Sequence, residues 1–78
     1  MPTVLRFGPW RFFFYSADNA EPPDVHIERD SCMAKFWLDP VRLDSSRGYP
    51  RSELKRLEAI IEENRILLAR SWHEYFGS

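Results

Sequence analysis

The sequence is poor in cysteine and glycine and has no long apolar run, and these absences exclude several classes of protein. The single cysteine, Cys32, cannot form an internal disulfide, which argues against a disulfide-rich secreted scaffold. No stretch reaches the roughly 18 apolar residues of a membrane-spanning helix, and no signal peptide is recognisable. We therefore expect a cytoplasmic protein that makes no contact with a membrane.

An excess of charge of one sign is also missing. The chain has 11 basic and 12 acidic residues and a formal net charge of −1. A general nucleic-acid binder normally shows a basic excess or a basic stripe. RNA is therefore only weakly supported as a partner.

Sequence motifs typical of phosphate binding and of nucleophilic catalysis are absent as well. The chain has no glycine-rich phosphate loop and no nucleophile elbow. Asp24, His26 and Glu28 alternate along one segment, so they could share one face of a strand and bind a divalent cation. No paired spacing such as HExxH or CxxC supports such a site. We therefore expect neither a metal nor a cofactor.

The chain does contain enough apolar material for one core. It has 78 residues, of which 44% are apolar and 15% aromatic, and a chain of this length is too short for a second core. We expect a single domain over residues 1–78, with a β-sheet region over 1–44 and a long helix over 49–77.

Short segments rich in β-branched and aromatic residues alternate with turn signals in the first part of the chain. Gly8-Pro9 follows the first of these segments, a loop over 16–23 separates the second from the third, and Arg29-Asp30-Ser31 and Asp39-Pro40 follow the third and the last. The fold class is therefore predicted to be α+β, an antiparallel β-meander of about four strands packed against one long C-terminal α-helix. The expected strands are residues 3–7, 10–15, 25–28 and 33–38.

A polar turn over 45–48 is expected to precede the helix, and Pro50 suits the first helical position. From there to Phe76, apolar residues recur at three- and four-residue steps, which is typical of one broad apolar helix face. A helix of this length would be about 40 Å long, whereas strands of about six residues span only about 20 Å. The helix should therefore overhang its sheet.

The overhang predicts a contact with another chain. The last turns of the helix contain Trp72, Tyr75 and Phe76, and their exposure would leave a large apolar patch. A homodimer or a constitutive complex with the end of the helix at the contact would cover this patch. The alternative is that the N-terminal strands reach under the end of the helix.

Side chains of a strand alternate between the two faces of a sheet, so the expected strands can be sorted by face. One face is wholly apolar and should meet the helix. The predicted core combines this face with the apolar face of the helix, and its members are Phe12, Phe14, Ile27, Phe36, Leu54, Leu57 and Ile61.

The other face mixes large aromatic side chains with charges, which is typical of a binding surface. Loops or neighbouring long side chains could instead half-cover the aromatic rings. We expect Arg11, Tyr15, His26 and Lys35 to be accessible there and to form the functional patch. The candidate binding residues are Arg11, Phe13, Tyr15, His26, Glu28, Lys35 and Trp37 on the sheet and His73 in the helix.

The same face carries groups that could perform acid–base chemistry. In phosphodiester cleavage one group moves a proton while cations stabilise the developing charge. His26 could move the proton, with Arg11 and Tyr15 beside it. These three residues are the candidate catalytic residues of a small, metal-independent ribonuclease.

Five segments spread over nearly the whole chain carry a family resemblance: the start MPTVL, the run RFFFYS, the pair Pro22-Pro23 followed by VHIE at 25–28, and the segments AKFWLDP and WHEYFG. With these segments the chain resembles a prokaryotic family known as domain of unknown function 4160, or DUF4160. The resemblance implies a role in toxin–antitoxin-like modules and no established activity. The family usually has His at the position of Asp24 and often at that of Asn64, whereas His26 and His73 match it and become candidate site positions.

These observations lead to one leading hypothesis and two alternatives. The leading hypothesis is an interaction protein, a component of a two-gene toxin–antitoxin-like module, that binds a small cognate protein through the aromatic face of its sheet. The alternatives are the ribonuclease that uses His26 and a purely structural homodimer. An enzyme requires His26 in a concave pocket near a cation or carboxylate, whereas an interaction module requires only a flat exposed aromatic patch.

Overall fold

The computed structural model describes residues 3–15 and 22–77. Of the loop expected over 16–23, residues 16–21 lie outside the described part of the chain. The predicted α+β class is confirmed, and no helix in the described residues is long and apolar enough to cross a membrane. The elements described are β1 (Thr3–Phe7), β2 (Trp10–Phe13), β3 (Asp24–Arg29), β4 (Cys32–Leu38), β5 (Val41–Arg47), α1 (Arg51–Glu63) and α2 (Arg65–Phe76).

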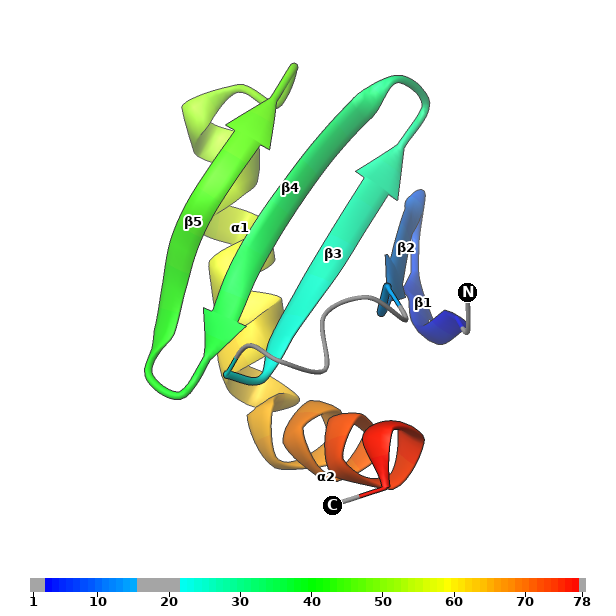
Figure 1. Cartoon of the computed structure of the whole chain (residues 1–78). Coiled ribbons are helices and arrows are strands. Elements are labelled where there is room, and N and C mark those ends of the chain that lie inside the picture. The colour runs from blue at the N-terminus through cyan, green and yellow to red at the C-terminus, as the bar shows by residue number, and fades with distance from the viewer. Residues whose placement is uncertain (1–2, 16–21, 78) are drawn as a thin grey trace.

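The described strands form one antiparallel sheet in the order β1-β2-β3-β4-β5, so each strand pairs with its neighbour in sequence (Figure 1). The sheet has five strands, and the prediction of about four is wrong. The additional strand is β5, and its last three residues lie in the segment 45–48, where we expected a polar turn before the helix. Figure 1 shows β3, β4 and β5 side by side, with the hairpin of β1 and β2 turned edge-on.

β5 forms because a two-residue turn at Asp39 and Pro40 returns the chain antiparallel to β4. Leu38 pairs with Val41 directly after this turn. β4 satisfies the backbone groups of one edge of β5, so the polar side chains of the strand do not prevent its formation. β5 is an edge strand, and six of its seven residues are exposed.

The face of the sheet that meets the helices is apolar, as predicted. The register places Val25 opposite Phe36 and Ile27 opposite Ala34. Leu54 is half-buried and packs against the core cluster. The remaining members of the predicted core are buried: Phe12, Phe14, Ile27, Phe36, Leu57 and Ile61.

The helical region is bent, and the prediction of one long helix is wrong. α1 ends before Asn64, whose φ of −112° and ψ of 17° are not helical values. The backbone N–H of Asn64 donates to the carbonyl oxygens of Ile60 and Ile61, each at 3.1 Å, and its side-chain Nδ2 donates to Ile60 O at 2.8 Å. These bonds satisfy the amide of Asn64 within an apolar stretch and stabilise the corner.

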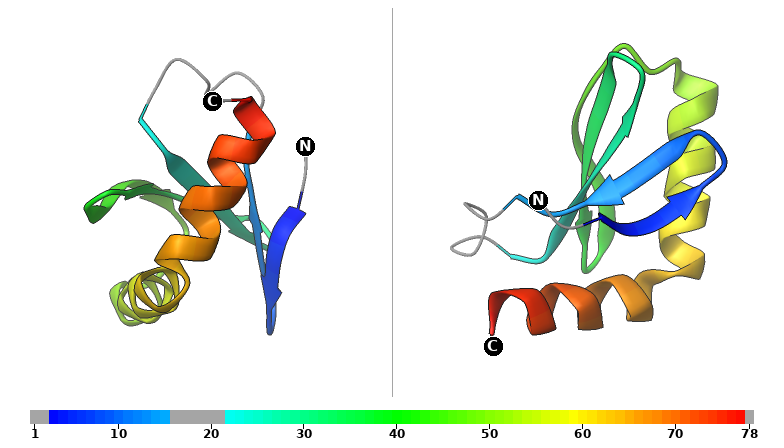
Figure 2. Two further views of the ribbon diagram at one scale, coloured as in Figure 1. Left: turned by 90° about the horizontal axis from the view of Figure 1, so that it is seen from below. Right: turned by 90° about the vertical axis from the view of Figure 1, so that its right-hand side faces the viewer.

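Because of this corner, α2 runs across one end of the sheet instead of extending beyond it (Figure 2). Trp72 is 5% exposed, and the Phe14 ring lies 6.2 Å from that of Tyr75 and 6.3 Å from that of Phe76. Phe14, the residue that follows β2, thus contacts the end of the helical region, while Tyr75 remains 42% exposed. The overhang from which we expected a homodimer is absent, and a homodimer through the end of the helix stays a prediction.

Phe36→Ala should lower the free energy of unfolding by about 3 to 5 kcal/mol, because it empties a site between the sheet and α1. Phe36 is 1% exposed, whereas Phe7, the matched control, is 46% exposed. Phe7→Ala should therefore cost much less. Chemical denaturation followed by circular dichroism measures both, and a larger loss for Phe7→Ala would contradict this packing.

Candidate functional site

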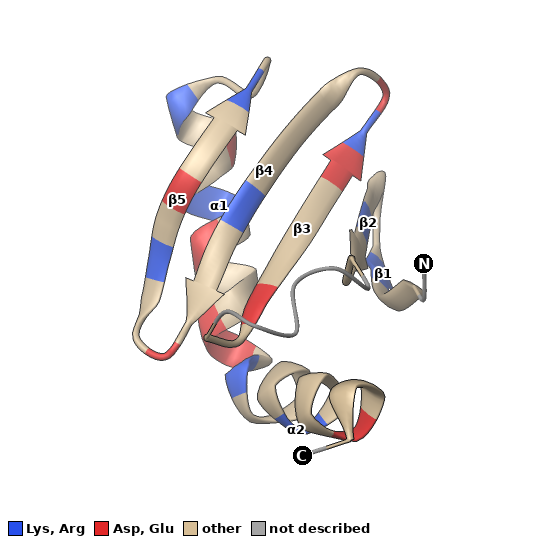
Figure 3. Ribbon diagram, in the orientation of Figure 1, with Lys and Arg blue, Asp and Glu red and all other residues tan. Residues whose placement is uncertain are grey.

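The face of the sheet turned away from α1 consists of three rows of side chains that cross the strands. Residues that pair directly across neighbouring strands share a face. We call this surface the open face, and Figure 3 shows charges of both signs along its strands. From β2 to β5 its rows are Arg11, Glu28, Met33 and Arg47; Phe13, His26, Lys35 and Ser45; and Asp24, Trp37 and Arg42.

His26 lies inside an aromatic cluster on this face. Its ring centroid is 4.4 Å from that of Tyr15, edge to face, and 5.6 Å from that of Phe13, which stacks on it. His26 is 7% exposed and Phe13 1%. The prediction of an accessible His26 is therefore wrong, because its aromatic neighbours cover it. The face turned away from α1 also carries Arg11, Tyr15 and Lys35, and each of these side chains is half-buried.

A fully buried carboxylate lies beside this cluster. Asp24 is 0% exposed, and its Oδ2 is 3.5 Å from His26 Nε2 and 3.6 Å from Lys35 Nζ. Neither oxygen of the carboxylate accepts a hydrogen bond within the described residues. Burying a carboxylate is costly unless neighbouring groups compensate it, and within the described residues His26 and Lys35 are the neighbours placed to do so.

Cationic side chains lie along the sheet on both sides of the cluster. Lys35 Nζ is 4.5 Å from the centroid of the Trp37 ring. Arg11 Nη1 donates to Glu28 Oε1 at 2.5 Å, and the Arg11 guanidinium carbon is 4.5 Å from the centroid of the Phe13 ring. These cation–π and ionic contacts hold long side chains in defined positions on the open face.

An open pocket of about 450 Å³ lies beside His26. The sequence reasoning missed the contribution of β5 because residues 45–48 read as a polar turn. The signal that could have revealed it is the two-residue turn at Asp39 and Pro40, directly after an apolar strand. The pocket joins three candidate residues to the end of β5, and its polar lining is Tyr15, His26, Lys35, Ser45, Ser46 and Arg47.

His73 is not part of this arrangement. It lies exposed on α2, with its ring 5.3 Å from that of Trp72. The structure thus brings the candidate residues of the sheet together on one face and leaves His73 apart from them.

The arrangement suits the binding of an anionic group. The ammonium of Lys35, the guanidinium of Arg47 and the serine hydroxyls are donors that match carboxylate or phosphate oxygens. Within residues 3–15 and 22–77, no three His, Cys, Asp or Glu side chains form a group that could hold a metal ion. The carboxylate of Asp24 could orient His26 as a base, but the low exposure of His26 restricts its access to a substrate.

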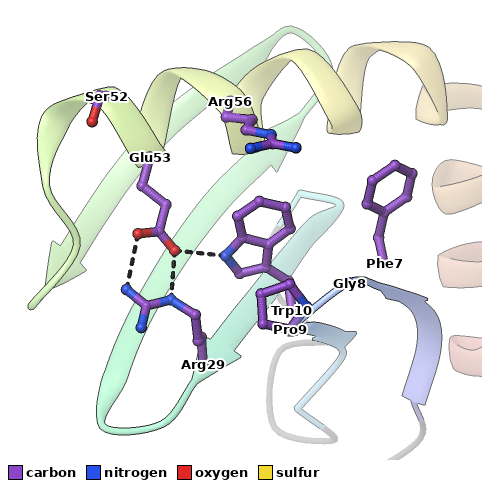
Figure 4. A pocket seen from close by; sticks show the side chains of 8 residues that line it. All are labelled: Phe7, Gly8, Pro9, Trp10, Arg29, Ser52, Glu53 and Arg56. Atoms are coloured by element: carbon purple, nitrogen blue, oxygen red, sulfur yellow. Dashed lines mark hydrogen bonds and ion pairs between the residues drawn. The ribbon is translucent and has the colours of Figure 1, made fainter.

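A second pocket, of about 540 Å³, lies between the hairpin of β1 and β2 and the start of α1 (Figure 4). Glu53 Oε2 accepts hydrogen bonds from Trp10 Nε1 at 2.7 Å and from Arg29 Nε at 2.6 Å, and Glu53 Oε1 accepts one from Arg29 Nη2 at 2.8 Å. The hydrogen bonds from Arg29 and Trp10 hold the pKa of Glu53 below its usual range, and the bond to Glu53 raises the pKa of Arg29. Since these groups satisfy one another, we interpret the pocket as structural.

A family model matches residues 10–73, which include all three rows of the open face and most of both helices. The chain belongs to the DUF4160 family. The family is described as a domain of unknown function, so membership confirms the resemblance and adds no activity. No curated protein and no solved structure matches the chain. The site of this DUF4160 member therefore has to be argued from its own geometry.

Asp24 and Lys35 should be energetically coupled. Lys35→Met leaves the buried carboxylate with less compensation and should lower stability by about 3 to 5 kcal/mol. In an Asp24→Asn background the same change should cost less, giving a coupling energy of about 0.5 to 3 kcal/mol in a double-mutant cycle. A cycle with Lys55→Met, on α1, is the control and should give almost no coupling. Equal costs of Lys35→Met in the two backgrounds would contradict the contact.

Glu53 should contribute to the loss of stability in acid. Its pKa in the folded chain lies below the ordinary value of 4.5, so its stabilising charge is present above that pH and is lost as the pH falls through the lower value. Glu53→Gln should be less stable than the wild type at neutral pH, and the difference should shrink as the pH falls below 4.5. Denaturation over a series of pH values on both sides of 4.5 measures this, with the exposed Glu58→Gln as control. A difference that does not change with pH would count against the ion pair.

Proposed function

We propose that this DUF4160 protein is an interaction protein that binds an acidic segment of a small partner protein on the open face of its sheet. The observation that supports this most is the pocket beside His26, where Lys35 and Arg47 lie among serine hydroxyls. α1 occupies the opposite face, so it does not obstruct a partner at this pocket.

The chemistry of the partner follows from the charges of the pocket. Arg47 is exposed at the end of β5, where its guanidinium could bind a carboxylate with two parallel hydrogen bonds. Trp37 is half-buried and offers an aromatic surface next to Lys35. Tryptophan and arginine are enriched among the residues that dominate binding energies, so Trp37 and Arg47 should contribute most.

We further propose that the partner belongs, with this chain, to a two-gene toxin–antitoxin-like module. Support comes from the family resemblance and from the absence of a recognisable catalytic motif in these 78 residues. In such a module the role of the chain is to hold its partner in a complex.

A ribonuclease is the second candidate, and it meets the requirement stated above for an enzyme, because His26 lines a pocket beside the carboxylate of Asp24. A carboxylate 3.5 Å from an imidazole nitrogen can orient a general base, and the cations of the same pocket could hold a phosphate. His26 is only 7% exposed, which leaves little of its ring accessible to a substrate. This low exposure makes the ribonuclease the weaker proposal.

Arg47→Glu should weaken partner binding at least about tenfold, equivalent to about 1.4 kcal/mol, and leave the melting temperature nearly unchanged because Arg47 is exposed. The partner is isolated by co-purification with the tagged chain and identified by mass spectrometry. Isothermal titration calorimetry with the purified partner then measures the affinity. Trp37→Ala should weaken binding as well.

Arg51→Glu is the matched control, because Arg51 is also exposed but lines a groove on the helix side of the sheet. Its affinity should equal that of the wild type. If Arg47→Glu binds the partner as tightly as the wild type does, the pocket beside His26 is not the binding site. If the wild type cleaves RNA, and if His26→Ala is folded but does not cleave it, then the protein is a ribonuclease and the proposal of an interaction protein is wrong.

A further inference from the structure

β5 ends the sheet, and its outer edge pairs with no other described strand. Six of its seven residues are exposed. A strand of this length at an edge offers a row of N–H and C=O groups to any strand that can pair with it. The chemistry of β5 indicates which strand that is.

The register shows that Leu43 turns its backbone groups outward. The N–H of Leu38 donates to the carbonyl oxygen of Pro23 at 3.0 Å, on the β3 side of β4. In an antiparallel ladder, adjacent residues turn their N–H and C=O groups to opposite sides. Trp37 therefore turns towards β5, where it pairs with Arg42. Arg42 bonds inward to β4, and Leu43, the next residue, points its donor and acceptor away from the sheet.

The side chain of Leu43 is also available for contact. It is 40% exposed and lines a groove of about 420 Å³ between β5 and α1. Phe36, Tyr49 and Leu54 contribute apolar surface to the same groove. An apolar side chain placed beside Leu43 would cover part of this surface.

We propose that β5 pairs antiparallel with β5 of a second copy of this chain, with the two Leu43 residues on the two-fold axis. Each Leu43 then donates to and accepts from Leu43 of the second copy, and their side chains meet over the groove. In this register Arg42 lies opposite Asp44 of the second copy, and Asp44 lies opposite Arg42. Two ion pairs therefore flank the axis.

The composition of β5 favours a second copy over an unrelated strand. Charged residues and bulges on an edge strand discourage pairing, and β5 has both, since a bulge between Leu43 and Ser45 makes Asp44 the extra residue. An unrelated strand would need an acidic residue opposite Arg42 and a basic residue opposite Asp44. An antiparallel copy matches them by symmetry.

The dimer has a consequence for the open face. The two-fold axis of an antiparallel strand pair is perpendicular to the sheet, so both open faces lie on the same side of one continuous sheet. The end of β5 lines the pocket described above, so two such pockets lie near the seam. Dimerisation requires no partner protein, and it can therefore be tested independently of the proposed function.

Sedimentation equilibrium of the wild-type chain at micromolar concentrations should give twice the monomer mass of 9.3 kDa. Leu43→Pro should be a folded monomer, because it removes an outward N–H and proline is tolerated on an edge strand at such a position. Arg42→Pro is the matched control. Its N–H belongs to the ladder with β4, so this variant should lose thermal stability.

Charge reversal tests the register itself. Arg42→Asp and Asp44→Arg each place like charges across the axis, so each variant alone should be monomeric. An equimolar mixture of the two variants should dimerise, because every facing pair then has opposite charges. Circular dichroism and melting curves establish that each variant is folded.

A wild-type chain that remains monomeric over a hundredfold range of concentration would overturn this proposal. A dimer that persists in Leu43→Pro and in both charge variants would also overturn it, since that dimer must use another surface. If Leu43→Pro fails to fold, the charge variants decide alone: failure of their mixture to dimerise contradicts the register.

Discussion

The packing of α1 against one face of the sheet determines what the other face can do. Phe12, Ile27 and Phe36 from the strands meet Leu57 and Ile61 from the helix, and none of them is more than 1% exposed. Burying a large apolar side chain contributes about 1.5 to 3 kcal/mol. Because side chains alternate along a strand, burying this set commits the intervening polar and aromatic residues to the open face. The candidate site is thus a consequence of the core.

The sequence was sufficient to predict this division, since the alternation of apolar and polar residues is a local signal. It was insufficient for β5, whose strand conformation comes from pairing with β4 and not from its own polar side chains. It was also insufficient for the corner at Asn64, which contains neither proline nor glycine. There the side-chain amide bonds back to Ile60, and the packing of α2 across the end of the sheet selects the bent form.

The sequence predicted most of the residues of the candidate site, but it did not predict how deeply each of them is buried. Alternation placed His26 and Lys35 on one face, but it did not reveal that His26 packs against Phe13 and against Tyr15, which lies beyond the end of β2. The contacts of Asp24 with both residues depend on the register between β3 and β4, which a single sequence does not specify. Arg47 was missed together with its strand. The same strand thus supplies part of the pocket with its side chains and, in our proposal, a dimer contact with its backbone.

The claim that the open face is the binding surface is tested most directly by fluorine NMR of the chain labelled with 5-fluorotryptophan. The three tryptophans sample different surfaces: Trp37 lies on the open face, Trp10 contacts the start of α1, and Trp72 is buried in α2. Substitution of each by phenylalanine assigns the resonances. Saturation with the co-purified partner should shift the Trp37 resonance and leave the other two in place. Shifts at Trp10 or Trp72 with an unchanged Trp37 resonance would contradict the account.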